Sequence, residues 1–282
     1  MHMSVFDDRV CELGEGPFWH PERSQFFWFD ILNRKLLTRD ANGPLEWQFE
    51  GMASAAGWVD RERMILATET GLSLFHIGEG TLEPLVEVEA DDPGTRSNDG
   101  RADRQGGFWF GTMGKEAERG RGTIYRYYRG ELRRLVSEIS IPNAICFTLD
   151  GRTAYYADTP SHKVWCQPLD ADGWPEGESR LFLDLSSEGL YPDGAVVDAE
   201  GGFWCALWSS GRVARFDAEG RMTHHLDLPG KNSTCPAFGG ADMRDVLVTS
   251  ALEGMTDPDA DQGLSYLLRA PVVGVPEPHV IL

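Results

Sequence analysis

Four short polar segments of this sequence carry side chains that could hold a cation or a polar small molecule. The segments are LGEGPFW at 13–19, RSNDGRAD at 96–103, SIPNAICF at 140–147 and LYPDGAVVD at 190–198. They place Glu15, Asn143 and Asp193 beside glycine or proline, close to apolar stretches. Two carboxylates and an amide carbonyl form an oxygen-only ligand set, which suits Ca²⁺, Mg²⁺ or Mn²⁺ and also admits Fe²⁺ or Zn²⁺.

Each segment also has a simpler interpretation as a turn. PDG at 192–194 is typical of a type I turn, and NDG at 98–100 is typical of a hairpin turn. Glu15 lies between two glycines, as in an exposed turn, and Asn143 follows a proline, as at the end of a strand. The shared position of the four segments in a repeat favours a joint role, so the elements that position them decide the question.

A repeated pattern of a polar turn followed by a short apolar strand runs through the chain. Its six copies have strands that begin near Phe26, Met64, Phe108, Ala154, Phe203 and Val246. Successive copies are 38 to 49 residues apart, and pairs of further strands follow most of them, as in GTIYRYYRGELRRLV. A period of about 40–50 residues with four strands per unit is typical of a β-propeller. Helical repeats would need longer segments with apolar residues at helical spacing.

The fold prediction is therefore all-β: a six-bladed β-propeller with four antiparallel strands per blade. We expect residues 1–282 to form a single domain, with residues 1–3, MHM, a remnant of cloning. In such a ring the inner strands of all blades end at one mouth of a central channel. Side chains from distant parts of the sequence can therefore meet there.

The composition limits the possible partners. Asp and Glu number 45 against 26 Lys and Arg, and the net charge of −19 disfavours nucleic acid and anionic membranes. No apolar run is long enough for a transmembrane helix, and the start of the sequence does not resemble a signal peptide. The five cysteines are odd in number and lack CxxC spacing, which favours reduced thiols and a cytoplasmic location.

Several familiar catalytic motifs are absent from the sequence. It contains no GxSxG, HExxH, P-loop or dinucleotide-binding glycine motif. DPDADQG at 257–263 has neither the glycine nor the glutamate that an EF-hand loop requires, so we interpret it as a solvated acidic loop.

The sequence resembles the SMP-30/gluconolactonase family, which includes regucalcin and bacterial sugar lactonases. Five segments carry the resemblance in order along the chain: LGEGPFWHPERSQFFWFDI, RSNDGRADRQGGFWFGTM, IPNAICFTLDGRTAYYADT, YPDGAVVDAEGGFWCALW and CPAFGGADMRDVLVTSA. The resemblance implies a six-bladed propeller with one divalent cation at the channel mouth. Two departures occur, since Ala144 stands where the family usually has glycine, and TLDG stands for its SPDG.

The resemblance also implies roles for individual residues. The metal ligands of the family correspond to Glu15, Asn143 and Asp193 of this sequence. The family's substrate-contacting positions correspond to Arg96, Asn98 and Glu116. Calcium is the first candidate for the cation, with Zn²⁺, Mn²⁺, Mg²⁺ or Fe²⁺ as alternatives.

The expected activity is hydrolysis of a sugar-derived aldonolactone to its acid. Water would be the nucleophile. It would be activated either by Asp193, acting as a catalytic base, or by the cation, which lowers the pKa of bound water. Arg96 offers several donors to the oxygens of a lactone, and a neutral lactone is favoured over an anionic one. Two alternatives stay open: another metal-dependent hydrolase, such as a phosphotriesterase-like enzyme, and a non-catalytic calcium-binding propeller. We expect a monomer whose partner is the small-molecule lactone.

Overall fold

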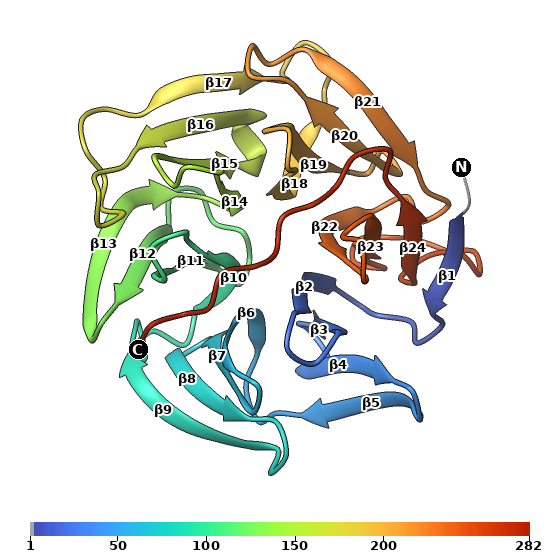
Figure 1. The fold of residues 1–282 in the computed structure, drawn as a ribbon, viewed down its shortest axis with the longest axis horizontal. Helices are drawn as coiled ribbons and strands as arrows, with labels where there is room; N and C mark the ends of the chain where they lie inside the picture. The colour runs from blue at the N-terminus through green and yellow to red at the C-terminus, as the bar shows by residue number, and fades with distance from the viewer. Residues whose placement is uncertain (1–2) are drawn as a thin grey trace.

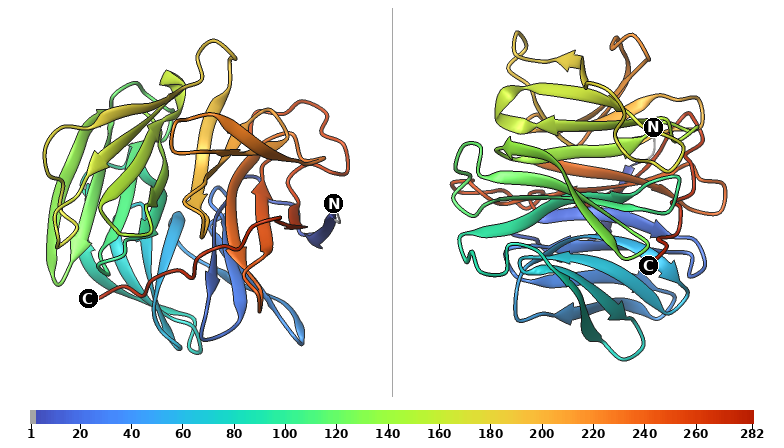
Figure 2. Two further views of the ribbon diagram at one scale, coloured as in Figure 1. Left: turned by 45° about the horizontal axis from the view of Figure 1, so that its top comes forward. Right: turned by 90° about the vertical axis from the view of Figure 1, so that its left-hand side faces the viewer.

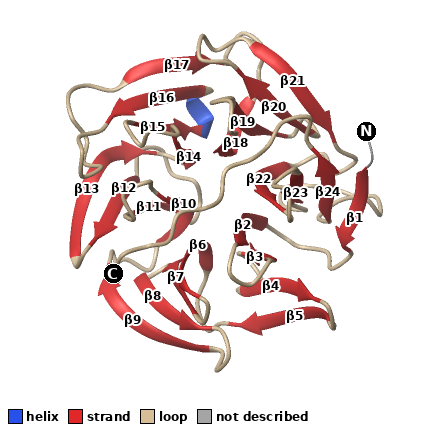
Figure 3. Ribbon diagram, in the orientation of Figure 1, coloured by secondary structure: helices blue, strands red, loops and turns tan. Residues whose placement is uncertain are grey.

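The computed structural model describes residues 3–282, which form a ring of six four-stranded antiparallel sheets (Figures 1 and 3). The predicted six-bladed propeller is confirmed. Of the expected cloning remnant, Met1 and His2 lie outside the described residues, whereas Met3 pairs with Leu268. No helix in residues 3–282 is long and apolar enough to cross a membrane.

Five sheets each consist of four consecutive strands, ordered from the axis outward. The first three sheets are β2 (Gly14–His20), β3 (Gln25–Asp30), β4 (Lys35–Asp40) and β5 (Gly43–Gln48); β6 (Ala53–Asp60), β7 (Arg63–Thr68), β8 (Gly71–His76) and β9 (Thr81–Glu87); and β10 (Thr95–Ala102), β11 (Phe108–Gly114), β12 (Gly122–Tyr128) and β13 (Glu131–Ile139). The next two are β14 (Pro142–Phe147), β15 (Thr153–Asp158), β16 (Lys163–Pro168) and β17 (Arg180–Asp184); and β18 (Tyr191–Val197), β19 (Phe203–Trp208), β20 (Arg212–Phe216) and β21 (Met222–Asp227). One 3-10 turn, η1 (Thr159–Ser161), follows β15.

The sixth sheet joins the two ends of the chain. It contains β22 (Ser233–Gly239), β23 (Asp245–Ser250) and β24 (Ser265–Arg269), and β1 (Met3–Asp7) forms its outer strand. β1 pairs antiparallel with β24, where Ser4 lies opposite Leu267 (Figure 1). This pairing closes the ring, because a strand from the start of the chain completes the last blade.

The second strand of each sheet matches the repeat in the sequence. The strands β3, β7, β11, β15, β19 and β23 begin within one residue of the predicted positions. Their large side chains pack between adjacent sheets; Phe27 and Phe29, for example, join Met64 and Leu66 of the second sheet in one buried cluster. Each sheet is therefore covered on both faces. This is what these strands require, because their consecutive apolar residues point alternately to the two faces.

In two of the sheets, an aspartate in the turn before the second strand binds the buried tryptophan of that strand. Asp103 accepts hydrogen bonds from Gly107 N (2.8 Å) and from Trp109 Nε1 (3.1 Å), and it pairs with the fully buried Arg126 (2.6 Å). Asp198 of the fifth sheet makes the equivalent contact to Trp204 Nε1 at 2.7 Å. The polar turn of the repeat thus anchors the buried tryptophan of its own strand.

The C-terminal segment 271–282 crosses one face of the ring, over the central channel (Figures 1 and 2). Its backbone bonds to several sheets: Ala199 N donates to Val273 O at 2.8 Å, and Trp58 Nε1 donates to Glu277 O at 2.8 Å. The side chain of Glu277 forms an ion pair with the buried Arg101 at the inner end of β10. This end of the channel is therefore closed by the chain itself.

Candidate active site

The polar segments are themselves the innermost strands, and they carry bulges at the positions of interest. All eight residues of β10 are buried, including the NDG sequence that is typical of a hairpin turn. In β10 the pairing with β11 skips from Ser97 to Gly100, so Asn98 and Asp99 bulge out of the ladder. Turn-forming residues serve here to make a bulge, which re-aims side chains beside a functional site.

The same bulge recurs in the other inner strands that carry candidate residues. Asp193 lies in the bulge of β18, and Glu15 and Asn143 are the last paired residues before the bulges of β2 and β14. Glu15, Asn98, Asn143 and Asp193 each lie in the first half of their strand. Because the inner strands all start at the same end of the channel, these residues lie toward that end, away from the C-terminal segment.

These residues surround one cavity of about 220 Å³. The cavity is lined by Leu13, Glu15, Arg96, Asn98, Met113, Lys115, Ala117, Ile141, Asn143, Thr159, Asp193, Trp208 and Glu253. Five of the six residues predicted for the site are therefore brought together. The volume lies below the range of about 300–1,000 Å³ typical of pockets for drug-sized ligands, which suits a compact molecule such as one sugar ring.

Two buried carboxylates dominate the electrostatics of the cavity. Burial, with the negative charge of Asp99, raises the pKa of Glu15 to about 8, although Arg96 works in the opposite direction. Burial also raises the pKa of Asp193 well above its ordinary value, and the charges of Glu15 and Asp99 add to this rise. Concentrated negative charge of this kind is stabilised by a bound cation.

Asn143 is held in one orientation by its neighbours. Its Nδ2 donates to Thr159 Oγ1 at 2.8 Å, and Thr159 Oγ1 in turn donates to the carbonyl of Pro192 at 2.8 Å. The amide oxygen therefore points away from Thr159, where it accepts from Asn98 Nδ2 at 3.0 Å and keeps a second lone pair. The following residue, Ala144, has a left-handed backbone with φ 57°, a conformation that glycine adopts more easily.

Arg96 and Asn98 form a connected pair. One Nη of Arg96 donates to Asn98 Oδ1 and to Ser97 O, each at 2.9 Å, while its Nε and other Nη have no protein acceptor within residues 3–282. The two N–H groups of Asn98 are both used, by Pro142 O and Asn143 Oδ1. Arg96 thus has donors left for a ligand, whereas Asn98 links Arg96 to Asn143.

Glu116 lies apart from the other candidate residues. Its side chain is exposed, and its neighbours Lys115 and Ala117 line the cavity instead. Ala117 has a left-handed backbone with φ 55°, within a turn whose path the sequence does not reveal. The substrate contact of Glu116 stays a prediction.

Several residues of the cavity wall were not predicted from the sequence, among them Trp208 and Glu253. Trp208 ends β19, and Glu253 follows β23, in the sixth sheet. Glu253 is the carboxylate that most strongly favours the charged form of Arg96, whose pKa burial lowers. Neither belongs to the polar segments, although the position of Trp208 at the end of a second strand marks it as close to the channel mouth.

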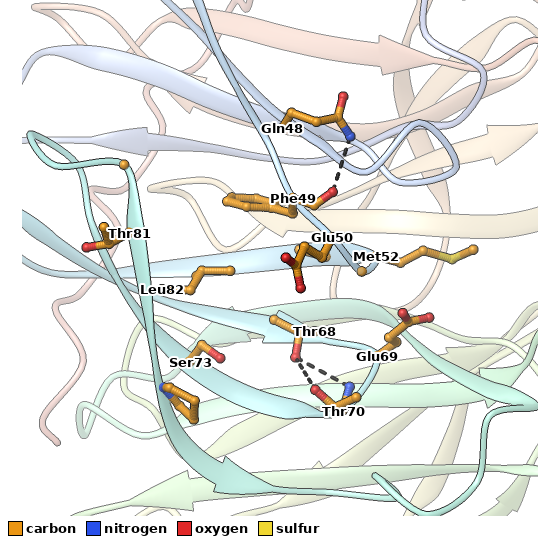
Figure 4. A pocket seen from close by; sticks show the side chains of 14 residues that line it. Gln48, Phe49, Glu50, Met52, Thr68, Glu69, Thr70, Ser73, Thr81 and Leu82 are labelled. Atoms are coloured by element: carbon orange, nitrogen blue, oxygen red, sulfur yellow. Dashed lines mark hydrogen bonds between the residues drawn. The ribbon is translucent and has the colours of Figure 1, made fainter.

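A larger depression of the surface lies elsewhere. It measures about 740 Å³ and lies between the first and second sheets, with Gln48, Glu50, Thr68 and Thr81 among its lining residues (Figure 4). Within residues 3–282 it shares no lining residue with the cavity. Its wall lacks the buried carboxylates that set the cavity apart.

The cavity residues fit a hard divalent cation better than a softer metal. Among residues 3–282, no three His, Cys, Asp or Glu side chains gather as a ligand cluster. The cavity instead offers two carboxylates and the fixed oxygen of Asn143. Oxygen donors of this kind suit calcium, magnesium or manganese.

Fold and cavity together define a six-bladed propeller with an acidic cavity between its inner strands. The chain belongs to the SMP-30/gluconolactonase/LRE-like family, whose model matches residues 13–252.

Named relatives and a solved structure agree with this assignment. A putative sugar lactone lactonase of Rhizobium meliloti (strain 1021) is 36% identical over 285 residues, covering 97% of this chain and 95% of that protein. An L-arabinolactonase of Azospirillum brasilense is 33% identical and covers 90% of this chain and 86% of that protein. The crystal structure of a calcium-binding regucalcin from Agrobacterium tumefaciens str. C58 superposes with a TM-score of 0.96 at 39% identity, covering 99% of this chain and 97% of that one.

Proposed function

We propose that this protein hydrolyses a neutral, sugar-derived aldonolactone to its aldonic acid with the help of one divalent cation. The observation that supports the proposal most strongly is the meeting of Glu15, Asn143 and Asp193 with Arg96 in one small cavity. Relatives of similar length named as sugar lactonases point in the same direction.

The cation would be held by Glu15, Asn143 and Asp193. When bound, it supplies a Lewis acid that polarises the lactone carbonyl and stabilises negative charge on its oxygen. Calcium is our first candidate, because the donors are oxygens and because the regucalcin structure is described as a calcium-binding protein.

The side chains divide the remaining work. The free N–H groups of Arg96 bind the oxygens of the lactone and orient its ring. Asp193 accepts a proton from the attacking water, because its carboxylate lies in the same cavity as Arg96, where the lactone binds. The protonated Asp193 then returns the proton to the ring oxygen, so that the C–O bond breaks and the open acid leaves.

The charges around the cavity favour a neutral substrate. The sequence offers three basic residues that could lie near the cavity: Arg96, Lys115 and Arg121. Lys115 pairs with Glu69 at 2.7 Å, and the exposed Arg121 pairs with Asp92 and Glu118. Arg96 is surrounded by Glu15, Asp193 and Glu253. A relative from Pseudomonas putida, 32% identical, is named 6-deoxy-6-sulfogluconolactonase. In this chain, however, the cavity is lined by three carboxylates, Glu15, Asp193 and Glu253, against two basic side chains, Arg96 and Lys115, and this balance disfavours a sulfonate.

The proposal is tested by hydrolysis of a panel of lactones. Purified protein with Ca²⁺, Mn²⁺ or Zn²⁺ is assayed on glucono-1,5-lactone, arabinono-1,4-lactone and 6-phosphogluconolactone, with spontaneous hydrolysis subtracted. We expect the neutral lactones to be hydrolysed, with kcat/KM at least about tenfold above that for the phosphorylated lactone. Failure on every neutral lactone with every cation would overturn the proposal.

A further inference from the structure

A groove lies beside the cavity, between the fifth and sixth sheets. It measures about 450 Å³ and shares the lining residues Trp208 and Glu253 with the cavity, so the two spaces are neighbours. Its far wall is part of the acidic segment 257–263, between β23 and β24, and Lys231 lies at its side. The segment that the sequence suggested to be a solvated loop therefore borders the site.

Trp208 stands at the junction of the two spaces. Its side chain is half-buried, and its indole Nε1 donates to no acceptor within residues 3–282. An indole with an apolar face and an unused N–H matches a sugar ring, which has apolar C–H faces and hydroxyls at its edge.

The polar atoms of the groove are also unused by the described protein. Lys231 has no ion-pair partner, and the carboxylate of Asp257 accepts no hydrogen bond, within residues 3–282. Sugar hydroxyls both donate and accept, so they can use an ammonium and a carboxylate together. Glu253, Asp257 and Asp259 outnumber Lys231, and an anionic ligand is therefore disfavoured.

The groove is also held in shape by bonds between its walls. Ser209 Oγ donates to Asn232 Oδ1 at 3.2 Å, and Asn232 Nδ2 donates to the carbonyl of Glu253 at 3.0 Å. These bonds connect the end of β19 with the loop after β23, across the boundary of two sheets. The groove is thus formed before any ligand binds.

From this geometry we propose that the groove is a second sugar subsite. It binds the neutral sugar that is attached to an aldonolactone, while the lactone ring occupies the cavity. The substrate class is thereby extended to disaccharide aldonolactones. This inference rests on the proposed lactonase function, because it places the reacting ring in the same cavity.

The test compares two lactones that share the reacting ring. Glucono-1,5-lactone fills only the cavity, whereas cellobiono-1,5-lactone carries an additional glucosyl group on the same ring. We expect the wild-type protein to hydrolyse both, with kcat/KM values within about tenfold of each other. The variant Lys231→Ala/Asp257→Gly is expected to lower the disaccharide-to-monosaccharide ratio of kcat/KM at least about fivefold.

The variants are chosen to keep the fold intact. Lys231 and Asp257 are exposed, and glycine suits the left-handed backbone of Asp257, with φ 52°. Glu50→Ala/Thr81→Ala, in the separate depression of Figure 4, is the matched control and leaves the ratio unchanged.

The outcomes separate this inference from the proposed function. Hydrolysis of the monosaccharide lactone alone, or an unchanged ratio in the groove variant, overturns the subsite and leaves the lactonase proposal intact. Hydrolysis of neither lactone overturns the proposed function, and the subsite falls with it.

Discussion

Asp193 occupies an energetically unfavourable position in the cavity. It is buried, it lies in the bulge of β18, and it faces a second carboxylate, Glu15. Taken alone, two adjacent buried carboxylates destabilise a fold, because each loses hydration and repels the other. We propose that this arrangement is tolerated because it serves both cation binding and proton transfer.

We predict that Asp193→Asn lowers kcat for lactone hydrolysis at least about 100-fold at saturating cation, because asparagine cannot accept the proton from water. The measurement is steady-state hydrolysis with the metal content of the same sample determined in parallel. Asp217→Asn, at an outer turn where the carboxylate pairs with Arg221, is the control and keeps full activity. Unchanged turnover of metal-loaded Asp193→Asn protein would remove Asp193 from the mechanism.

At the scale of elements, the bulge in each inner strand positions the site. The bulge in β14 forces Ala144 into a left-handed conformation that costs alanine about 1–2 kcal/mol. The strained residue, Ala144, comes directly after Asn143, whose amide must point into the channel. The family usually has glycine at this place, and the positive φ supplies the physical reason.

Glycine substitution tests this strain. We predict that Ala157→Gly destabilises the protein at least about 1 kcal/mol more than Ala144→Gly. Both alanines are fully buried, and Ala157 lies opposite Asn143 in the regular strand β15, so the two variants lose the same methyl group. Urea denaturation measures the difference. Equal losses would show that the backbone at Ala144 is not strained.

The sequence predicted the elements better than their exact roles. The repeat located the second strand of every sheet, because few other structures are compatible with a polar turn followed by a short apolar run. It did not show that the segment 95–102 is a buried strand, since NDG suits a turn and a bulge equally well. The positions of Lys115, Glu116 and Ala117 depend on the path of one turn, which no periodicity determines.

The remaining wall residues were beyond the sequence for a different reason. Trp208 and Glu253 reach the cavity only because the sheets close into a ring. Trp208 is the last residue of the family-like segment 191–208, where it was given no role, and Glu253 lies outside all five segments. The resemblance to a known family supplied the candidate ligands, and the geometry then showed that they meet.

At the scale of the whole molecule, the C-terminal segment closes the far end of the channel. Burial works to lower the pKa of Arg101, but the charge of Glu277 and its other neighbours raise it above its ordinary value. The Arg101–Glu277 pair has side-chain exposures of only 8% and 14%. Loss of one partner therefore leaves a charge that water reaches poorly.

We predict that Glu277→Gln lowers the free energy of unfolding by about 2–3 kcal/mol, because Asp99 still offsets part of the Arg101 charge. Urea denaturation provides the measurement. Glu131→Gln, which breaks an exposed pair with Arg133, is the control and leaves the denaturation midpoint unchanged. A Glu277→Gln midpoint equal to that of the control would show that this pair does not anchor the segment.

The central claim is that Glu15, Asn143 and Asp193 hold one divalent cation that lactone hydrolysis requires. The most direct test is hydrolysis of glucono-1,5-lactone by chelator-treated protein, before and after titration with Ca²⁺, Mn²⁺ or Zn²⁺. We predict a loss of at least about 100-fold in chelator and recovery with one equivalent of cation, with no recovery in Glu15→Gln/Asp193→Asn protein. Full activity of the chelated, metal-free wild type would contradict the account.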